Sequence, residues 1–214
     1  MIGNGDKVRS INPPVSSFGE KRKFNWLELF INRRRLKAAE RVLRQLSLSN
    51  EAPRVLELGC GFYGVNISYL KRRFPKASFV GVDLRVEKSF AINGIELVEG
   101  NLNTWEPDAS YDCVLSLAVA EHLVDLPRHF RLISQSLVAG GTAIITTPKP
   151  QAHFILWLGL ILGIFDRESI EDHKLYLTRS GIEVLANQSS LRMMEHHSIL
   201  ILNQSFTLIR KQDN

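Results

Sequence analysis

Cysteine is scarce in this chain of 214 residues, which contains only Cys60 and Cys113. Neither belongs to a C-x-x-C pair, and two cysteines are too few for a disulfide scaffold, which favours a reducing compartment. His, Cys, Asp and Glu nowhere cluster at the spacing of metal ligands, so we predict no metal site. We interpret both thiols as small core residues rather than nucleophiles.

Long apolar runs are also missing. The longest near-apolar run is residues 154–165, FILWLGLILGIF, whereas a helix needs about 20 apolar residues to span a bilayer. Residues 1–10 contain no apolar region of the kind that forms a secretory signal peptide. We therefore expect a cytoplasmic protein that is soluble or is attached to a membrane only at its surface.

The net charge of +5 is unevenly placed along the chain. Residues 1–50 contain eleven Lys or Arg and four Asp or Glu, whereas the remaining residues contain sixteen and eighteen. The basic excess therefore belongs to the N-terminal segment, where a solvated face is the default interpretation and contact with an anionic membrane surface is the alternative. No nucleic acid partner is expected, because the main part is slightly acidic and has no NPPY-like motif for a flipped base.

The chain divides into three regions. Residues 1–23 are rich in Gly, Pro and Ser without periodicity, and we interpret them as a mobile arm. Residues 24–50 repeat apolar side chains at helical spacing and predict an amphipathic N-terminal helix with a break near Asn32. Residues 51–214 form the main domain, with an insertion at 150–177 that interrupts its regular pattern.

Short apolar segments alternate with helical ones throughout the main domain. Strands are expected at 54–58, 78–84, 95–98, 111–117, 142–147, 191–197 and 206–210, and helices at 65–74, 127–138 and 178–188. Gly140 and Gly141 should end the second of these helices. Strands that alternate with helices form parallel sheets covered on both faces. We therefore predict an α/β fold: a Rossmann-like, doubly wound, mostly parallel seven-stranded sheet with an antiparallel C-terminal strand pair and an N-terminal helix.

A glycine-rich turn, ELGCG at residues 57–61, directly follows the first strand. Glycine lets the backbone turn sharply and approach a ligand closely, and ligands of open α/β sheets bind at the carboxyl ends of the strands. Asp83 ends the second strand 22 positions after Gly61, about the spacing at which a carboxylate accepts ribose hydroxyls. The pattern predicts a site for a nucleotide-type ligand, and glycines that serve turn geometry alone are the alternative.

Glu57 indicates which nucleotide is bound. A dinucleotide site must hold a pyrophosphate at the start of a helix, and a carboxylate just before the first glycine does not suit that anion. S-Adenosylmethionine carries an ammonium and a sulfonium and no phosphate. We therefore predict S-adenosylmethionine as the cofactor and methyl transfer to a small molecule as the function, with an NAD-dependent oxidoreductase or a non-catalytic cofactor-binding module as alternatives.

Five runs in order strengthen this prediction. VLELGCG, GVDL, EGNL, YDCVLSLAVAEHL and GGTAIITTPKP resemble the class I S-adenosylmethionine-dependent methyltransferases, most closely the bacterial branch that modifies quinones, sugars and lipids. The resemblance covers about residues 53–150. It implies seven cofactor-binding residues, which are Glu57, Gly59, Gly61, Asp83, Asn101, Leu102 and Leu117.

The resemblance also implies a role for each of these residues. The acid and glycines of the first loop hold the methionine part, Asp83 binds the ribose, Asn101 and Leu102 flank the adenine, and the last of the seven offers a backbone carbonyl. Two positions depart from the family pattern. Asn101 stands where Asp is usual, and Tyr63 takes the third glycine position of G-x-G-x-G, with Gly64 next.

Histidines are the candidate general bases if the acceptor is a hydroxyl that must lose a proton. His122, which follows the fourth strand, is the first candidate, and a backbone hydrogen bond is its structural alternative. His173, in the insertion, is the second candidate, with a loop salt bridge as the alternative. We expect His129, His196 and His197 at outer positions of a helix and a strand, without a catalytic role.

The apolar run at residues 154–165 must be buried or must bury something. It could form a lid over an apolar substrate, a membrane-surface patch or a dimer contact. Together with Arg33, Arg34 and Arg35 on the N-terminal helix, the run favours an apolar or lipid-linked acceptor at a membrane surface.

Overall fold

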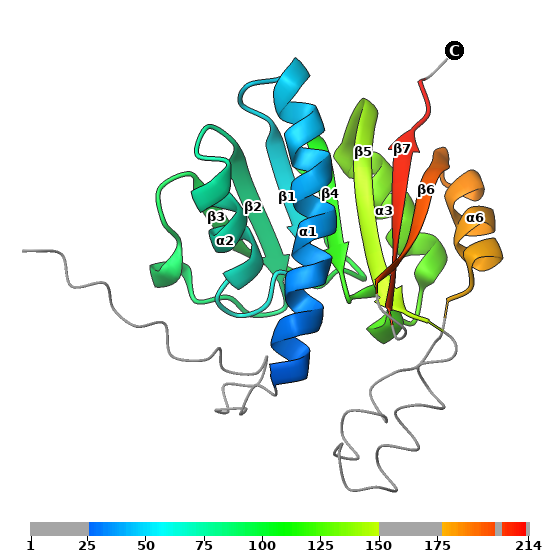
Figure 1. Cartoon of the computed structure of the whole chain (residues 1–214), viewed down its shortest axis with the longest axis horizontal. Coiled ribbons are helices and arrows are strands. Elements are labelled where there is room, and N and C mark those ends of the chain that lie inside the picture. The colour runs from blue at the N-terminus through cyan, green and yellow to red at the C-terminus, as the bar shows by residue number, and fades with distance from the viewer. Residues whose placement is uncertain (1–25, 150–176, 200–202, 213–214) are drawn as a thin grey trace, which may run out of the picture.

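The computed structural model describes residues 26–149, 177–199 and 203–212 (Figure 1). The predicted arm at 1–23 and the apolar run at 154–165 lie outside these residues. The helices are α1 (Trp26–Ser49), α2 (Val65–Arg73), α3 (Leu126–Ser136) and α6 (Arg179–Gln188), with single 3-10 turns at η1 (Lys88–Phe90) and η2 (Ala120–His122). The strands are β1 (Arg54–Leu58), β2 (Ser78–Asp83), β3 (Ile95–Glu99), β4 (Tyr111–Leu117), β5 (Leu137–Pro148), β6 (Leu191–Ile199) and β7 (Asn203–Arg210).

The strands form one seven-stranded sheet in the order β3-β2-β1-β4-β5-β7-β6. Neighbours among β1 to β5 run parallel, whereas β7 runs antiparallel to both β5 and β6. This arrangement confirms the predicted mostly parallel sheet with an antiparallel C-terminal pair. η1 fills the short connection between β2 and β3.

Helices cover both faces of the sheet, α1 and α2 on one face and α3 and α6 on the other (Figure 1). Successive side chains of a strand point to opposite faces. Val55 of β1 therefore lies in one buried cluster with Leu43 of α1 and Ile67 of α2, whereas its neighbour Leu56 lies in the other with Phe130 of α3. Cover on both sides explains why the strands read as nearly continuous apolar runs.

α1 is a single helix along its length, so the predicted break near Asn32 is wrong. Leu36 and Ala39 are buried on the face that meets the sheet, and their spacing continues the apolar stripe. The side chain of Asn32 donates to Asn66 on α2 at 3.1 Å. A polar side chain with a partner outside its own helix does not compete with the helix backbone.

β5 begins at Leu137, ahead of the strand start that the sequence predicts, and α3 has already ended there. The ladder with β4 includes Leu137 and then Thr142, so the residues between them form an irregularity in the strand. Gly140 takes a left-handed φ of +76° inside it. Gly140 and Gly141 therefore bend a strand rather than end a helix, which corrects the prediction.

His129 is buried, whereas the sequence pattern predicts an outer position. α3 places its Nε2 atom 2.9 Å from the hydroxyl of Ser116 on the inner face of β4. Burial lowers the pKa of His129 to about 4, so the imidazole is neutral at pH 7. A neutral imidazole with a hydroxyl partner is an acceptable core residue, which polarity alone does not reveal.

The C-terminal helix and strand pair form as predicted, except that β7 begins at Asn203, three residues before the predicted start, and β6 ends at Ile199, two residues after the predicted end. Thr178 caps α6, because its hydroxyl accepts a hydrogen bond from the backbone N–H of Gly181 at 3.1 Å. Leu191 of β6 pairs with Arg210 of β7, and the antiparallel ladder continues along both strands. No helix within the described ranges is long and apolar enough to cross a membrane.

Candidate cofactor site

The predicted site lies at the carboxyl ends of β1, β2 and β4. Leu58 of β1 pairs with Val82 of β2 and with Ser116 of β4, so the three strands end at the same edge of the sheet. The chain moves from β1 to β2 on one side and resumes with β4 on the other. Such a reversal of strand order opens a crevice outside the strand ends, where ligands of α/β sheets bind.

The glycine-rich loop crosses this edge in conformations that favour glycine. The angle φ is +74° at Gly59 and +73° at Gly61. Gly59 also lets Val119, in the loop after β4, pack directly against the backbone, since a Cβ at residue 59 would lie 2.4 Å from Cγ2 of Val119. A Cβ at Gly61 would meet nothing within 4 Å, so the space over this residue is open. The loop therefore has a tight joint at one glycine and open space at the other.

Gly64, rather than Tyr63, takes the part of the third glycine. Its φ is +56°, α2 begins at the next residue, and a Cβ here would lie 2.7 Å from Cδ2 of Leu97. Tyr63 instead places its ring against Phe90 of η1, with ring centroids 4.5 Å apart. The geometry therefore favours a loop one residue longer than G-x-G-x-G.

Asp83 joins this loop to the end of β2. Its Oδ2 accepts a hydrogen bond from the backbone N–H of Gly61 at 2.8 Å, and Oδ1 accepts from that of Leu84 at 2.8 Å. Its backbone carbonyl accepts from the N–H of Gly100, just after β3, at 2.8 Å. A carboxylate offers about four lone-pair positions, so acceptor capacity remains for hydroxyl donors of a ligand.

Glu57 is fully buried next to this loop. Its Oε1 accepts from Nδ2 of Asn66 at 2.9 Å, while Oε2 has no hydrogen-bond partner among the described residues. Burial raises the pKa of Glu57 from 4.5 to about 8, the Asn66 hydrogen bond opposes the rise, and Asp83 adds to it. A buried carboxyl group becomes favourable as an anion only when a cationic donor reaches it.

Asn101 and Leu102 lie directly after β3, next to the strand end that carries Asp83. The side-chain oxygen of Asn101 accepts from the backbone N–H of Asn103 at 3.0 Å and from its side-chain amide at 3.1 Å. Leu102 is partly buried against the core cluster. The residue that departs from the family pattern thus shapes its own turn.

Leu117 is buried at the end of β4, and an unexpected conformation follows it. Ala118 has φ of +60°, which is rare for a residue with a side chain and costs about 1 kcal/mol. Its N–H donates to the carbonyl of Thr146 at 3.0 Å and to the Thr146 hydroxyl at 3.1 Å. This turn brings Val119 onto Gly59, and no residue type in the sequence signals it.

The candidate bases are placed differently from one another. His122 is exposed at the end of η2, and His173 lies outside the described residues. Glu121, which the sequence analysis missed, is 1 % exposed, and its Oε2 has no hydrogen-bond partner in the described part of the chain. Burial raises the pKa of Glu121, and Arg35 and His122 oppose the rise. Its apolar neighbours, Ala120 and Leu123, are the one sequence signal for its burial.

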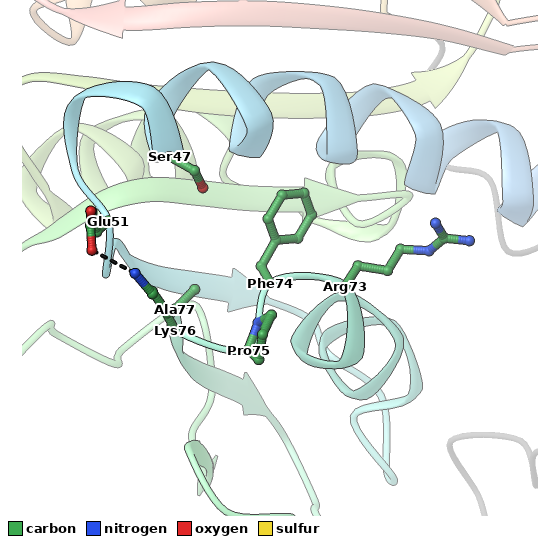
Figure 2. A pocket seen from close by; sticks show the side chains of 7 residues that line it. All are labelled: Ser47, Glu51, Arg73, Phe74, Pro75, Lys76 and Ala77. Carbon is green, nitrogen blue, oxygen red and sulfur yellow. Dashed lines mark hydrogen bonds and ion pairs between the residues drawn. The ribbon is translucent and has the colours of Figure 1, made fainter.

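A hollow of about 350 Å³ lies at the other edge of the sheet, where β1 and β2 begin (Figure 2). In Figure 2 the ring of Phe74 points toward α1, and Lys76 pairs with Glu51 at 2.6 Å across the rim. This ion pair is exposed, and the hollow is remote from the glycine-rich loop. Among the residues that the structure describes, no group of three or more His, Cys, Asp and Glu could hold a metal ion.

The fold and this edge define a class of protein: a Rossmann-like domain with a glycine loop and an acid after β2, arranged to hold an adenosine-type cofactor. The chain belongs to the methyltransferase domain family, whose family model matches residues 30–196. This membership agrees with the family that the five sequence runs resemble.

Two curated relatives resemble part of this chain. The chain is 30% identical over 114 residues to the fatty-acid O-methyltransferase of Mycolicibacterium smegmatis, covering 50% of this chain and 41% of that protein. It is 31% identical over 119 residues to the trans-aconitate 2-methyltransferase of an Azoarcus species, covering 54% and 46%. The matched region thus spans less than half the length of either relative.

Solved structures support the fold. A SAM-dependent methyltransferase of Aquifex aeolicus superposes with a TM-score of 0.58 at 14% identity, covering 80% of this chain and 88% of that one. At this identity the likeness concerns the fold alone. It confirms the predicted Rossmann-like architecture.

The buried Glu57 predicts a distinct dependence of stability on pH. Its folded pKa of about 8 exceeds the ordinary 4.5, so the folded state binds the extra proton between these values. Stability is therefore lost as pH rises through this window, by about 1.4 kcal/mol per unit. We expect the free energy of unfolding of Glu57→Gln, relative to that of wild type, to rise by about 3 kcal/mol from pH 5 to pH 8, measured by urea unfolding without ligand.

Exposed Glu96 on β3 provides the matched control. Glu96→Gln should keep the wild-type pH dependence, and the titration of His129 is common to all three proteins and cancels. Parallel stability curves for Glu57→Gln and wild type would contradict the prediction.

Proposed function

We propose that this chain transfers a methyl group from S-adenosylmethionine to a small-molecule acceptor. The observation that carries the proposal is the hydrogen bond from Gly61 to Asp83. There a carboxylate with unused lone pairs lies beside open space at the strand ends. When bound, the cofactor supplies a methyl group on a positively charged sulfur. Membership of the methyltransferase domain family supports this ligand over NAD.

Each part of the cofactor has a partner of suitable chemistry at this edge. In the proposal, Asp83 accepts hydrogen bonds from the ribose hydroxyls, and Gly59 and Gly61 let the backbone approach the methionine part. Glu57 pairs its buried carboxylate with the ammonium, which would offset the burial of both charges. Asn101 and Leu102 flank the adenine, and Leu117 offers its backbone carbonyl.

The acceptor is proposed to be a carboxylic acid with an apolar portion. The names of both relatives specify carboxylic acids as acceptors. A carboxylate is ionised at pH 7, so its oxygen already carries the electron pair that attacks the methyl carbon. The domain then has to align the two reactants and exclude water, and no proton has to be removed.

His122 and His173 are proposed as general bases only for an acceptor that must lose a proton. His122 is exposed at the end of η2, in the turn that follows β4. Buried Glu121 is a further candidate on the same turn, because burial raises its pKa and so makes this carboxylate a stronger base. The choice of acceptor therefore decides whether these side chains matter to the rate.

The cofactor site is tested by two glycines with the same geometry. Gly61 and Gly140 both have positive φ, of +73° and +76°, and at both a Cβ would meet nothing within 4 Å. Alanine should therefore destabilise the fold at either position by about 1 kcal/mol. In titration calorimetry, Gly61→Ala should weaken S-adenosylhomocysteine binding at least about tenfold, because its methyl enters the ligand space, and Gly140→Ala should not.

Equal affinities for the two alanine variants would remove the open space over Gly61 from the site. Failure of the wild-type protein to bind S-adenosylhomocysteine would overturn the cofactor assignment itself. Binding without turnover on any acceptor would favour a non-catalytic cofactor-binding module.

The acceptor class is tested with methyl-labelled cofactor and paired substrates, fatty or tricarboxylic acids against the matching alcohols. We expect methyl esters from the acids, with a rate that changes less than about threefold in His122→Ala, because no base is required. A drop of about 100-fold or more in this variant would instead identify His122 as the base and a hydroxyl as the acceptor.

We also propose contact between α1 and an anionic membrane surface. Arg33, Arg34 and Lys37 are exposed, and none forms an ion pair with another described residue. Phe30, 40% exposed, lies under the guanidinium of Arg34 at 5.2 Å from the ring centroid. A helix that pairs basic and aromatic side chains on an exposed face is typical of interfacial binding.

Vesicle flotation tests this contact. The protein should float with phosphatidylglycerol-containing vesicles and not with phosphatidylcholine vesicles. The triple variant Arg33→Ala, Arg34→Ala, Lys37→Ala should lose about 100-fold in partition, since each basic residue contributes about 1 kcal/mol near an anionic surface. Arg44→Ala, which removes a cation paired with Glu40, is the control. Equal flotation on both lipids would remove the proposal.

A further inference from the structure

The alternation of β1 decides which helices can reach Glu57. Val55 of the same strand faces the layer of α1 and α2, and Glu57 is two residues further along. The buried carboxyl group therefore points to the layer that contains the N-terminal helix. In Figure 1 α1 lies across this face and begins beyond the carboxyl ends of the strands.

Two amides connect α1 to the carboxyl group of Glu57. Nδ2 of Asn32 on α1 donates to Oδ1 of Asn66 on α2 at 3.1 Å, and Nδ2 of Asn66 donates to Oε1 of Glu57 at 2.9 Å. An amide has its acceptor on one side and its donors on the other. The donation from Asn32 therefore turns the donor side of Asn66 toward Glu57.

These two hydrogen bonds, from Asn32 to Asn66 and from Asn66 to Glu57, form an amide relay. The relay binds one oxygen of the Glu57 carboxyl group and does not bind the other. Oε1 of Glu57 is held by Asn66, whereas Oε2 is buried and has no hydrogen-bond partner in the described ranges. A carboxyl group that is held at one oxygen has a fixed direction for the other. An incoming ammonium would thus meet a single oxygen that is already oriented, once the carboxyl group has lost its proton.

We propose that Asn32 and Asn66 are positioning residues, which orient Glu57 for the ammonium group of the cofactor. The inference rests on the proposed function, since it assigns the ligand part that Glu57 would recognise. It makes α1 a part of the cofactor site rather than a mere cover of the sheet. Neither asparagine need touch the ligand.

α1 is attached to α2 at a second place, which provides a matched control. The hydroxyl of Tyr69 donates to Oε1 of Glu40 at 2.8 Å, and Arg73 pairs with the same oxygen at 3.2 Å. These contacts join the same two helices without reaching Glu57. Tyr69→Phe therefore loosens the helix pair while it leaves the amide relay in place.

The test compares two ligands that differ in the amino-acid part. S-Adenosylhomocysteine has the ammonium group, and 5′-methylthioadenosine lacks it. We expect Asn32→Ala to weaken S-adenosylhomocysteine about threefold and Asn66→Ala about tenfold, as loss of one or two hydrogen bonds implies. Affinity for 5′-methylthioadenosine should change less than about twofold in both variants, and Tyr69→Phe should change neither ligand.

The outcomes separate the inference from the proposed function. If the wild-type protein binds neither ligand, the proposed function fails. If it binds both and Asn32→Ala weakens them equally, or if Tyr69→Phe has the same effect as Asn32→Ala, the positioning role is overturned and α1 acts through helix packing alone. Asn32 is only partly buried on α1, so its variant keeps the test available should Asn66→Ala fail to fold.

Discussion

The hydrogen bond from the N–H of Gly61 to the carboxylate of Asp83 is the constraint on which the site depends. It joins the loop after β1 to the end of β2, and it requires a backbone that only glycine adopts readily at φ of +73°. The same acid receives Gly100 through its backbone carbonyl, so the loop after β3 is fixed to the same point. Three strand ends are therefore held by one residue, and the crevice is shaped before a ligand arrives.

The second constraint is electrostatic. Glu57 is buried without a cation among the described residues, in a protein whose main part is otherwise ordinary in charge. A structural role would be served better by an apolar residue or by a fully hydrogen-bonded one. Asn66 instead donates to only one oxygen of the carboxyl group, and a cationic ligand can donate to the other. Stability given up in the empty protein is thus available as affinity for an ammonium.

Much of the fold was predictable because its signals are local. Strand ends at 54–58 and 111–117 agree with the structure, since an apolar run between turn residues has little freedom. The β5 start was missed because Gly140 and Gly141 serve equally well as a helix stop or a strand bulge, and only pairing with β4 decides between them. The break predicted near Asn32 failed for a similar reason, because its partner lies on another helix.

The residues of the site also divide into those with a local sequence signal and those whose burial depends on tertiary packing. The glycines and Asp83 are predictable from the sequence, because turn geometry and an acid at a strand end are properties of short segments. Glu121 and His129 did not, since burial of a polar side chain depends on which face its element turns to the core. Sequence polarity suggested His122 as the important residue of its turn, yet the structure buries the neighbouring acid instead.

α1 connects these observations, because it meets the carboxyl edge at two separate places. Asn32 reaches Glu57 through α2, and the guanidinium of Arg35 donates to Asn203 of β7 at 2.9 Å while it opposes the rise in the pKa of Glu121. The two residues are one helical turn apart, so a shift of the helix would move both. The family match begins within α1, at residue 30, so most of this helix lies in the matched region. Through Asn66 and Arg35, α1 is therefore linked to both buried acids of this edge, Glu57 and Glu121.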